Sequence, residues 1–351
     1  LSGRLRIPGD KSVSHRSVMF SALGRTPVRI TNFLHAADCL STVACMKALG
    51  AEVEMISDTE LVVTGHGLHG LMEPEAILDA GNSGTTLRLL MGLLAPQPFS
   101  AVFTGDASLS RRPMGRVIKP LSQMGAKIVG RKGNTLLPIT VCDPEAKLHG
   151  MTYESPVASA QVKSAILLAG MFADGPTTVV EPVTSRDHTE KMLAAFGVKT
   201  EKQGTAVTMH PVADDEYIAP AAIEVPGDIS SAAYWLVLAS LGPGRHLVLE
   251  NVGTNETRTG ILDVLEAMGA NIQRENVRTS GGEEACDLVI TAAKLHGTRF
   301  GKDMMPRLID EVPAIAVAAL FAEGDTVITG AGELRVKETD RLQAIADEWG
   351  R

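Results

Sequence analysis

A recurring unit limits what this chain can fold into. Four times, a helical stretch ends in a glycine that is followed by a β-prone stretch. The glycines are Gly50, Gly125, Gly197 and Gly269, separated by 75, 72 and 72 residues. Each fits the position after a helix, where the left-handed backbone favours glycine. A helix rich in small residues, a strand, an amphipathic helix and two strands recur around each glycine, so the unit reads βαβαββ. In the first copy the predicted elements are 12–23, 28–33, 37–49, 52–56 and 61–64.

A second repeated phrase predicts where the chain changes domain. Pro-Gly-Asp occurs at residues 8–10 and again at 226–228, and Gly9 and Gly227 are 218 residues apart, about three units. We therefore expect residues 1–10 to begin domain I, 11–226 to form domain II from three units, and 227–351 to be the remainder of domain I. Residues 227–351 have room for fewer than two units, so we expect the final strands of the last unit and a whole sixth unit to be missing at the C-terminal end.

Composition excludes several classes of protein. Hydrophobic residues make up 44% and charged residues 21% of the 351 residues, which is typical of a globular protein. No apolar run reaches the roughly 18 residues of a membrane span. A net charge of −8 argues against a nucleic-acid surface. The four cysteines have no zinc-ligand spacing, and we expect free thiols in a reducing, cytoplasmic compartment.

The stretch Ile-Pro-Gly-Asp-Lys-Ser-Val-Ser-His-Arg, residues 7–16, predicts an anion site. Pro8 and Gly9 favour a turn, and the first amides of the helix that follows suit an anion. Lys11 stands at this helix start, and Ser12 and Arg16 share one helix face. The alternative is a capped surface helix whose basic residues are solvated.

The second unit opens with Asp-Ala-Gly-Asn-Ser-Gly-Thr-Thr-Leu-Arg, residues 79–88. Its glycines and hydroxyls at a helix start can hold a carboxylate or a phosphate, and Arg88 adds charge; tight helix packing is the alternative. Arg111 and Arg112 follow in a loop. Since adjacent arginines point apart, we expect one of them, Arg112, to bind a ligand with its fork of donors.

The third unit opens with Ser-Pro-Val-Ala-Ser-Ala-Gln-Val-Lys-Ser, residues 155–164. Ser159 and Gln161 lie near a helix start, where they can bind phosphate and hydroxyl groups, and Lys163 shares a face with Ser159. A capped helix with an exposed lysine is the alternative. The stretch 185–188, Ser-Arg-Asp-His, also precedes a helix, and its histidine is more typical of a structural residue.

Two acidic motifs lie near the end of the chain. Asp310 and Glu311 begin an apolar helix, where a carboxylate can cap the helix or act as a general base. In residues 335–341, Arg-Val-Lys-Glu-Thr-Asp-Arg, both Lys337 and Glu338 are expected on the same helix face as Arg341. A solvated charged face is the usual interpretation. Here, however, basic and hydroxyl groups recur at the helix starts of successive units.

Taken together, these motifs resemble the 5-enolpyruvylshikimate-3-phosphate (EPSP) synthase family. The resemblance covers the whole chain through PGDKSxSHR, GNSGTTLR, RRPMG, SAQVKSA, SRDHTEK, PGDxSSAA, IDEVP and RVKETDR, in family order. It implies an α/β fold of two domains, each an inside-out α/β barrel of βαβαββ units, the enolpyruvyl transferase fold. It also implies transfer of the enolpyruvyl group of phosphoenolpyruvate to the 5-hydroxyl of shikimate-3-phosphate, with no metal or organic cofactor.

The resemblance also implies a role for each matching residue. Those expected to bind shikimate-3-phosphate are Lys11, Ser12, Arg16, Ser159, Ala160, Gln161, Ser185, Arg186, Asp310 and Lys337. Those expected to bind phosphoenolpyruvate are Lys11, Asn82, Gly84, Arg112, Gln161 and Arg341. Asp310, Glu338 and Lys11 are expected to be catalytic: Asp310 accepts the proton of the 5-hydroxyl, and Glu338 moves protons at the enol methylene carbon. Gly84 leaves room for the inhibitor glyphosate.

Two other interpretations remain open. UDP-N-acetylglucosamine enolpyruvyl transferases share the fold but carry Gly-Ala-Lys-Asn where this chain has Gly-Asp-Lys-Ser, and a reactive cysteine near the position of Ala107. The other alternative is a catalytically incomplete anion-binding fragment. EPSP synthases supply a further arginine, in an Asp-His-Arg element, and a lysine that this chain lacks. We therefore expect a monomer that binds shikimate-3-phosphate weakly and turns over poorly, without a nucleic-acid or membrane partner.

Overall fold

The chain divides into two compact units. A computed structural model describes residues 2–242, 244–336 and 339–349. Unit 1 comprises residues 1–10, 226–279 and 283–351, and unit 2 comprises residues 11–225 and 280–282. The main boundaries thus fall after residues 10 and 225, next to the predicted ones after 10 and 226.

Unit 2 contains three sheets with one strand plan. In each sheet a first strand pairs in parallel with the second, and the remaining two strands continue antiparallel. The sheets have the orders β13-β2-β4-β3, β5-β6-β8-β7 and β9-β10-β12-β11. Their strands are β2 Val28–Thr31, β3 Glu52–Ser57, β4 Glu60–Thr64, β5 Leu78–Asp79, β6 Ala101–Thr104, β7 Lys127–Gly130, β8 Leu136–Cys142, β9 Thr152–Glu154, β10 Thr177–Val180, β11 Thr200–Gln203, β12 Ala206–Met209 and β13 Ala222–Glu224.

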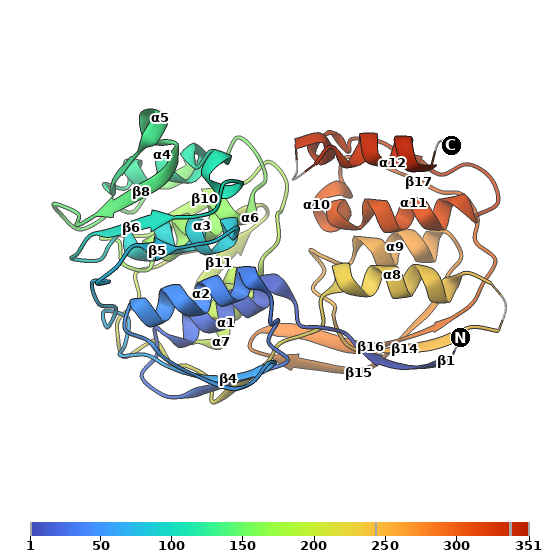
Figure 1. The fold of residues 1–351 in the computed structure, drawn as a ribbon, viewed down its shortest axis with the longest axis horizontal. Helices are drawn as coiled ribbons and strands as arrows, with labels where there is room; N and C mark the ends of the chain where they lie inside the picture. The colour runs from blue at the N-terminus through green and yellow to red at the C-terminus, as the bar shows by residue number, and fades with distance from the viewer. Residues whose placement is uncertain (1, 243, 337–338, 350–351) are drawn as a thin grey trace. The chain divides into compact units, whose positions relative to one another are not determined.

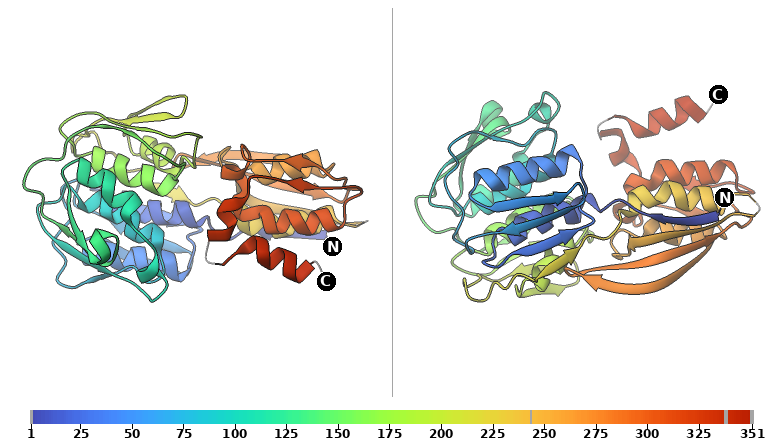
Figure 2. Two further views of the ribbon diagram at one scale, coloured as in Figure 1. Left: turned by 90° about the horizontal axis from the view of Figure 1, so that it is seen from above. Right: turned by 60° about the horizontal axis from the view of Figure 1, so that its bottom comes forward.

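The helices of unit 2, other than the exposed turn at 131–134, pack inside its sheets (Figure 2). The first helix of each repeat is buried on almost every side: in α6 all nine residues from 162 to 170 are buried. Along the strands, burial alternates between inward and outward side chains, as in β4. This arrangement explains the small, apolar composition of those helices. The helices are α1 Lys11–Ser21, α2 Ala37–Ala48, α3 Gly84–Leu94, α4 Gly115–Gln123, α5 Arg131–Asn134, α6 Ala160–Gly170 and α7 His188–Ala195, with a 3-10 turn η1 at Leu109–Arg111.

The repeat pattern is confirmed. All elements predicted for the first copy are present within two residues at each boundary. The four glycines that follow a helix have φ angles of 95°, 101°, 81° and 93°, in chain order, which is the left-handed region expected there. The structure therefore has the α/β class that this local pattern predicted.

The two Pro-Gly-Asp phrases lie against each other in unit 1. Gly9 and Gly227 form an antiparallel bridge, the amide of Asp10 donates to the carbonyl of Pro226 at 2.7 Å, and the amide of Asp228 donates to the carbonyl of Pro8 at 2.8 Å. As a result, the strand that leads the α8 repeat is the N-terminal β1, whereas β13 leads the α1 repeat. In these two repeats the first strand is thus separated from its helix by more than 200 residues.

Unit 1 repeats the same plan with its own apolar core (Figure 1). Its helices α8, α9 and α11 lie on one face of the sheet β1-β14-β16-β15, and β17 pairs in parallel with β18. The elements are β1 Ser2–Arg6, α8 Ile229–Ser240, β14 His246–Gly253, α9 Gly260–Ala267, β15 Asn271–Ser280, β16 Glu283–Thr291, β17 Arg299–Phe300, α10 Met305–Leu308, η2 Ile309–Glu311, α11 Val312–Leu320, β18 Val327–Ile328, η3 Gly332–Val336 and α12 Arg341–Trp349. No helix in the described part of the chain is long and apolar enough to span a membrane.

Candidate anion-binding site

The start of α1 places two predicted ligands near the surface and one in the interior. Lys11 is exposed, and its ammonium lies 3.2 Å from the carboxylate of Asp38. Arg16 is only 3% exposed. Its guanidinium donates to the Ser12 carbonyl at 3.0 Å and also to side chains of α6 and α7. These bonds connect α1 to both helices of the third repeat, so Arg16 has a structural role whatever it binds.

Four side chains form what we call the arginine group: Asn82, Arg88, Arg112 and Gln161. Arg88 lies in α3 and Gln161 in α6, whereas Asn82 precedes α3 and Arg112 follows η1. Arg112 donates to the Asn82 side-chain oxygen at 2.7 Å and to the Ser108 hydroxyl at 3.0 Å. Arg88, in α3, donates to the amide oxygen of Gln161, at the start of α6. The structure therefore brings together three predicted ligands and adds Arg88, which the prediction had left out of the ligand set.

The electrostatics of the arginine group favour an anion. Among the described residues, neither Arg88 nor Arg112 forms an ion pair within 4 Å, although both lie in a carboxylate-rich chain. Burial, together with the nearby positive charges of Arg112 and Arg116, lowers the pKa of Arg88 to about 10. An anion bound here would relieve this repulsion.

Gly84 lies beside the arginine group. A Cβ atom placed on this buried glycine would be 2.7 Å from Nη1 of Arg88 and 3.8 Å from Nη1 of Arg112. The absence of a side chain therefore lets two guanidinium groups approach the first residue of α3. An anion bound beside Gly84 would therefore lie close to both arginines.

A second set, which we call the serine group, consists of Ser159, Glu181 and Ser185. Ser159 caps α6, with its hydroxyl accepting from the amide of Val162 at 3.5 Å. The carboxylate of Glu181, directly after β10, accepts from the amide of Ser159 at 3.0 Å and from the hydroxyl of Ser185 at 2.8 Å. The structure thus holds the two predicted serines at one carboxylate. Ala160 follows Ser159 and Arg186 follows Ser185 in the sequence, and both are half-buried.

Lys163 is the clearest correction to the expected site. The sequence predicted that Lys163 is either a ligand on the helix face of Ser159 or an exposed lysine, but the Lys163 side chain is only 1% exposed. Its ammonium lies 3.2 Å from Glu181 and 2.8 Å from Glu190. A lysine within the apolar helix Ala-Gln-Val-Lys-Ser-Ala-Ile-Leu-Leu is a signal for such a pair, since a buried ammonium requires carboxylates. No sequence motif pointed to Glu181.

In unit 1, the predicted general base Asp310 is half-buried and accepts from Nη1 of Arg341 at 3.1 Å. Next to it, Glu311 is buried and accepts from the hydroxyl of Ser230. Arg258 is also buried and lies 3.2 Å from the carboxylate of Asp10, which fixes the surrounding loops. Helix α12 begins at Arg341. Lys337 and Glu338, the other two predicted residues of this motif, lie outside the described residues, so their expected positions stay predictions.

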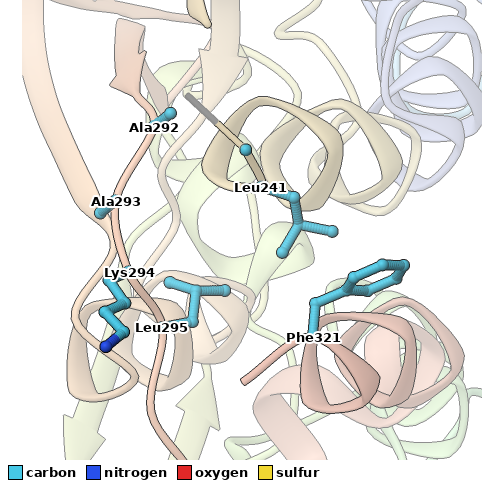
Figure 3. A pocket seen from close by; sticks show the side chains of 7 residues that line it. Leu241, Ala292, Ala293, Lys294, Leu295 and Phe321 are labelled. Atoms are coloured by element: carbon cyan, nitrogen blue, oxygen red, sulfur yellow. The ribbon is translucent and has the colours of Figure 1, made fainter. Parts of the chain in front are cut away.

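A separate pocket of about 480 Å³ in unit 1 is not the candidate site. Figure 3 shows Leu241, Leu295 and Phe321 turned toward one another in it, while the Lys294 side chain extends away from them. The Lys294 ammonium is paired with Glu323 at 2.6 Å. An apolar pocket whose cation is already neutralised is poorly suited to a phosphorylated acid, and none of the predicted ligands lines it.

Comparison with known proteins gives one consistent result. A model of the family described as EPSP synthase (3-phosphoshikimate 1-carboxyvinyltransferase) matches residues 1–351. Proteins named 3-phosphoshikimate 1-carboxyvinyltransferase are 52% identical in Desulforudis audaxviator and 51% in Bacillus subtilis, over 99% of this chain and 80% of each relative.

The solved structures agree with this result. An EPSP synthase from Acinetobacter baumannii is 46% identical with a TM-score of 0.91, over 99% of this chain and 77% of that one. The enolpyruvyl transferase NikO from Streptomyces tendae has a TM-score of 0.72 at 19% identity, over 94% of this chain and 75% of that one. The likeness to NikO concerns the fold alone.

Proposed function

The chain belongs to the EPSP synthase family, and we propose that its arginine and serine groups hold the two substrates of a 3-phosphoshikimate 1-carboxyvinyltransferase. This reaction of the shikimate pathway joins the enolpyruvyl group of phosphoenolpyruvate to the 5-hydroxyl of shikimate-3-phosphate and releases phosphate. The observation that carries the assignment is the pair of arginines, Arg88 and Arg112, which lack an ion-pair partner among the described residues.

We assign the arginine group to phosphoenolpyruvate. Arg112 offers a planar fork of donors already oriented by Asn82 and Ser108, which suits a carboxylate or a phosphate. Gln161 and the open space at Gly84 lie beside it. Lys11 and Arg341 are the further cations that we assign to this substrate. Glyphosate, an anion of similar charge, is expected to compete at the same group.

We assign the phosphate of shikimate-3-phosphate to the serine group. The start of α6 supplies backbone amides at Ala160 and Gln161, and Ser159 and Ser185 supply hydroxyls. Ala160 has no polar side chain, so its contact is through the backbone. Arg186 is the cation of this segment. In the proposed arrangement Lys11, Ser12 and Arg16 bind other polar groups of the same substrate.

The chemistry follows from these assignments as an addition and an elimination. Asp310 accepts the proton of the 5-hydroxyl while the hydroxyl oxygen bonds to C2 of phosphoenolpyruvate, and Glu338 delivers a proton to the methylene carbon. The tetrahedral ketal then loses a proton from that methyl carbon as the bond from C2 to the phosphate oxygen breaks. Lys337 hydrogen-bonds near the 5-hydroxyl. The cations lower the barrier by stabilising the negative charge that develops on phosphate.

Calorimetry with paired arginine variants tests this proposal. Phosphoenolpyruvate is titrated into the chain with shikimate-3-phosphate present, for Arg112→Ala and for its exposed neighbour Arg111→Ala as the matched control. Loss of a charged hydrogen-bonding pair is expected to weaken binding about 10- to 100-fold for Arg112→Ala. The control is expected to stay within about twofold of the parent. Equal effects of the two substitutions would contradict the assignment.

Phosphate release distinguishes the remaining interpretations. An EPSP synthase releases phosphate from phosphoenolpyruvate when shikimate-3-phosphate is the acceptor, whereas a UDP-N-acetylglucosamine enolpyruvyl transferase requires the amino sugar. Calorimetric binding of shikimate-3-phosphate without phosphate release would favour an anion-binding fragment. We expect phosphate to be released from phosphoenolpyruvate only when shikimate-3-phosphate is the acceptor. The expected rate is below that of a relative such as the Bacillus subtilis protein.

A further inference from the structure

Glu181 occupies a place that no ligand assignment explains. Each oxygen of its carboxylate holds a different segment: Oε1 accepts from the amide of Ser159 at 3.0 Å, and Oε2 accepts from the amide of Ser185 at 3.2 Å and from its hydroxyl at 2.8 Å. Glu181 is only 3% exposed, so a substrate has little access to it. One buried side chain therefore sets the position of both serines relative to each other.

Lys163 pairs with this carboxylate in the interior of unit 2. Burial disfavours the charged ammonium, but the carboxylates of Glu190 and Glu181 outweigh burial and raise the pKa of Lys163 above its usual value. The ammonium lies 3.2 Å from Glu181 and 2.8 Å from Glu190. An ionised carboxylate accepts hydrogen bonds more strongly than a neutral one. The lysine thus supports the bonds of Glu181 to both serines through its ion pair with the Glu181 carboxylate.

We propose that Glu181 is a positioning residue of the phosphate subsite, one that fixes the spacing of Ser159 and Ser185 for a substrate phosphate. This inference rests on the proposed assignment of the two serines to shikimate-3-phosphate. The Ser185 hydroxyl can turn from Glu181 to a phosphate oxygen, because the amide of the same residue keeps its own bond to the carboxylate. The segment at Ser185 therefore stays in place while its hydroxyl proton changes acceptor.

The substitution Glu181→Gln removes this arrangement with almost no change of volume. Glutamine has one acceptor oxygen and one donor NH2 group, so in either orientation the NH2 group faces a donating serine amide. Only one of the two serine segments can then be held. Glu181→Asp keeps the charge but is one methylene shorter, so it cannot reach both serines at hydrogen-bond distance. It serves as a second variant that tests the same bonds if Glu181→Gln does not fold.

Glu190→Gln is the matched control. Glu190 is buried and lies against the same ammonium, but the structure gives it no hydrogen bond to Ser159 or Ser185. Both substitutions remove one buried negative charge next to Lys163. A general effect on charge or stability would therefore appear in both variants, whereas an effect on serine spacing would appear only in Glu181→Gln. Thermal unfolding of each variant verifies that the folded states are compared.

The experiment is calorimetric titration of shikimate-3-phosphate into the parent chain and the three variants. We expect the dissociation constant to rise about 10-fold or more for Glu181→Gln and Glu181→Asp, and to stay within about threefold for Glu190→Gln. Unchanged or tighter binding by both Glu181 variants, or an equal loss in Glu190→Gln, would overturn the inference. If the parent chain itself does not bind shikimate-3-phosphate, the proposed function fails and the inference with it, so the two failures are distinguishable.

Discussion

Replacing Gly84 by alanine perturbs the arginine group at a defined atom. The new Cβ would lie 2.7 Å from Nη1 of Arg88, whereas an ordinary contact begins near 3.4 Å, so the guanidinium must move by about 0.7 Å. Arg88 is partly buried and bonded to Gln161, and that movement strains or breaks the bond. Nη1 of Arg112, at 3.8 Å, meets the methyl group at an ordinary distance. The substitution therefore acts mainly through Arg88.

The expected magnitude follows from that bond. A hydrogen bond that involves a charged group contributes about 1.5–3 kcal/mol. The methyl group also occupies the space that we assign to an anion beside Arg112. We therefore expect the dissociation constant of glyphosate, measured with shikimate-3-phosphate present, to rise at least about 10-fold, which corresponds to about 1.4 kcal/mol. The free energy of unfolding should fall by about 1–3 kcal/mol.

Calorimetry and urea denaturation measure the two effects. Gly175→Ala is the control, because a Cβ atom at Gly175 meets no atom within 4 Å and its φ is not in the left-handed region. We expect both properties of this control to match the parent within error. If glyphosate binds Gly84→Ala as tightly as it binds the parent chain, the steric argument is wrong.

Three further expectations concern the buried parts of the molecule. Gly92→Ala should lower the free energy of unfolding by about 3 kcal/mol, since its Cβ would lie 2.3 Å from the backbone oxygen of Ala165; thermal denaturation with an unchanged midpoint would contradict this close packing of α3 and α6. Lys163→Met should cost about 3–5 kcal/mol at pH 7 in urea denaturation, because two buried carboxylates lose their cation. Because the pKa of Lys163 is raised in the folded state, that difference should persist up to its unfolded pKa of about 10.5 and shrink as the pH rises through the higher folded value; a difference already lost at pH 9 would refute it. Iodoacetamide at pH 8 should label the partly exposed Cys142 before Cys45, because burial and the charge of Asp79 raise the pKa of Cys45 to about 12. Labelling in the reverse order, measured by mass spectrometry, would contradict the described burial.

Local signals carried much of the fold. A glycine after a helix and the alternation of apolar residues along a strand are properties of short stretches, and they predicted the repeat, its elements and the positive φ of Gly50. The repeated Pro-Gly-Asp phrase predicted where the chain changes domain, whereas the bridge between Gly9 and Gly227 was found only in the structure. The motifs also contain most of the residues that we propose as ligands, because hydroxyls and basic side chains at helix starts are groups that bind anions.

Long-range packing decided the rest. The leading strand of the first repeat is β13, more than 150 residues after its partner β2, and no short stretch encodes that pairing. The sequence alone identified Lys163 only as a member of a helix face, and burial against Glu181 and Glu190 gave it a different role. The sequence likewise placed Arg88 only near a helix start, and its bond to Gln161 in the arginine group arises from the packing of α3 against α6. Helix and strand formation depends on neighbouring residues, whereas the partner of a buried charge depends on which distant segments pack around it.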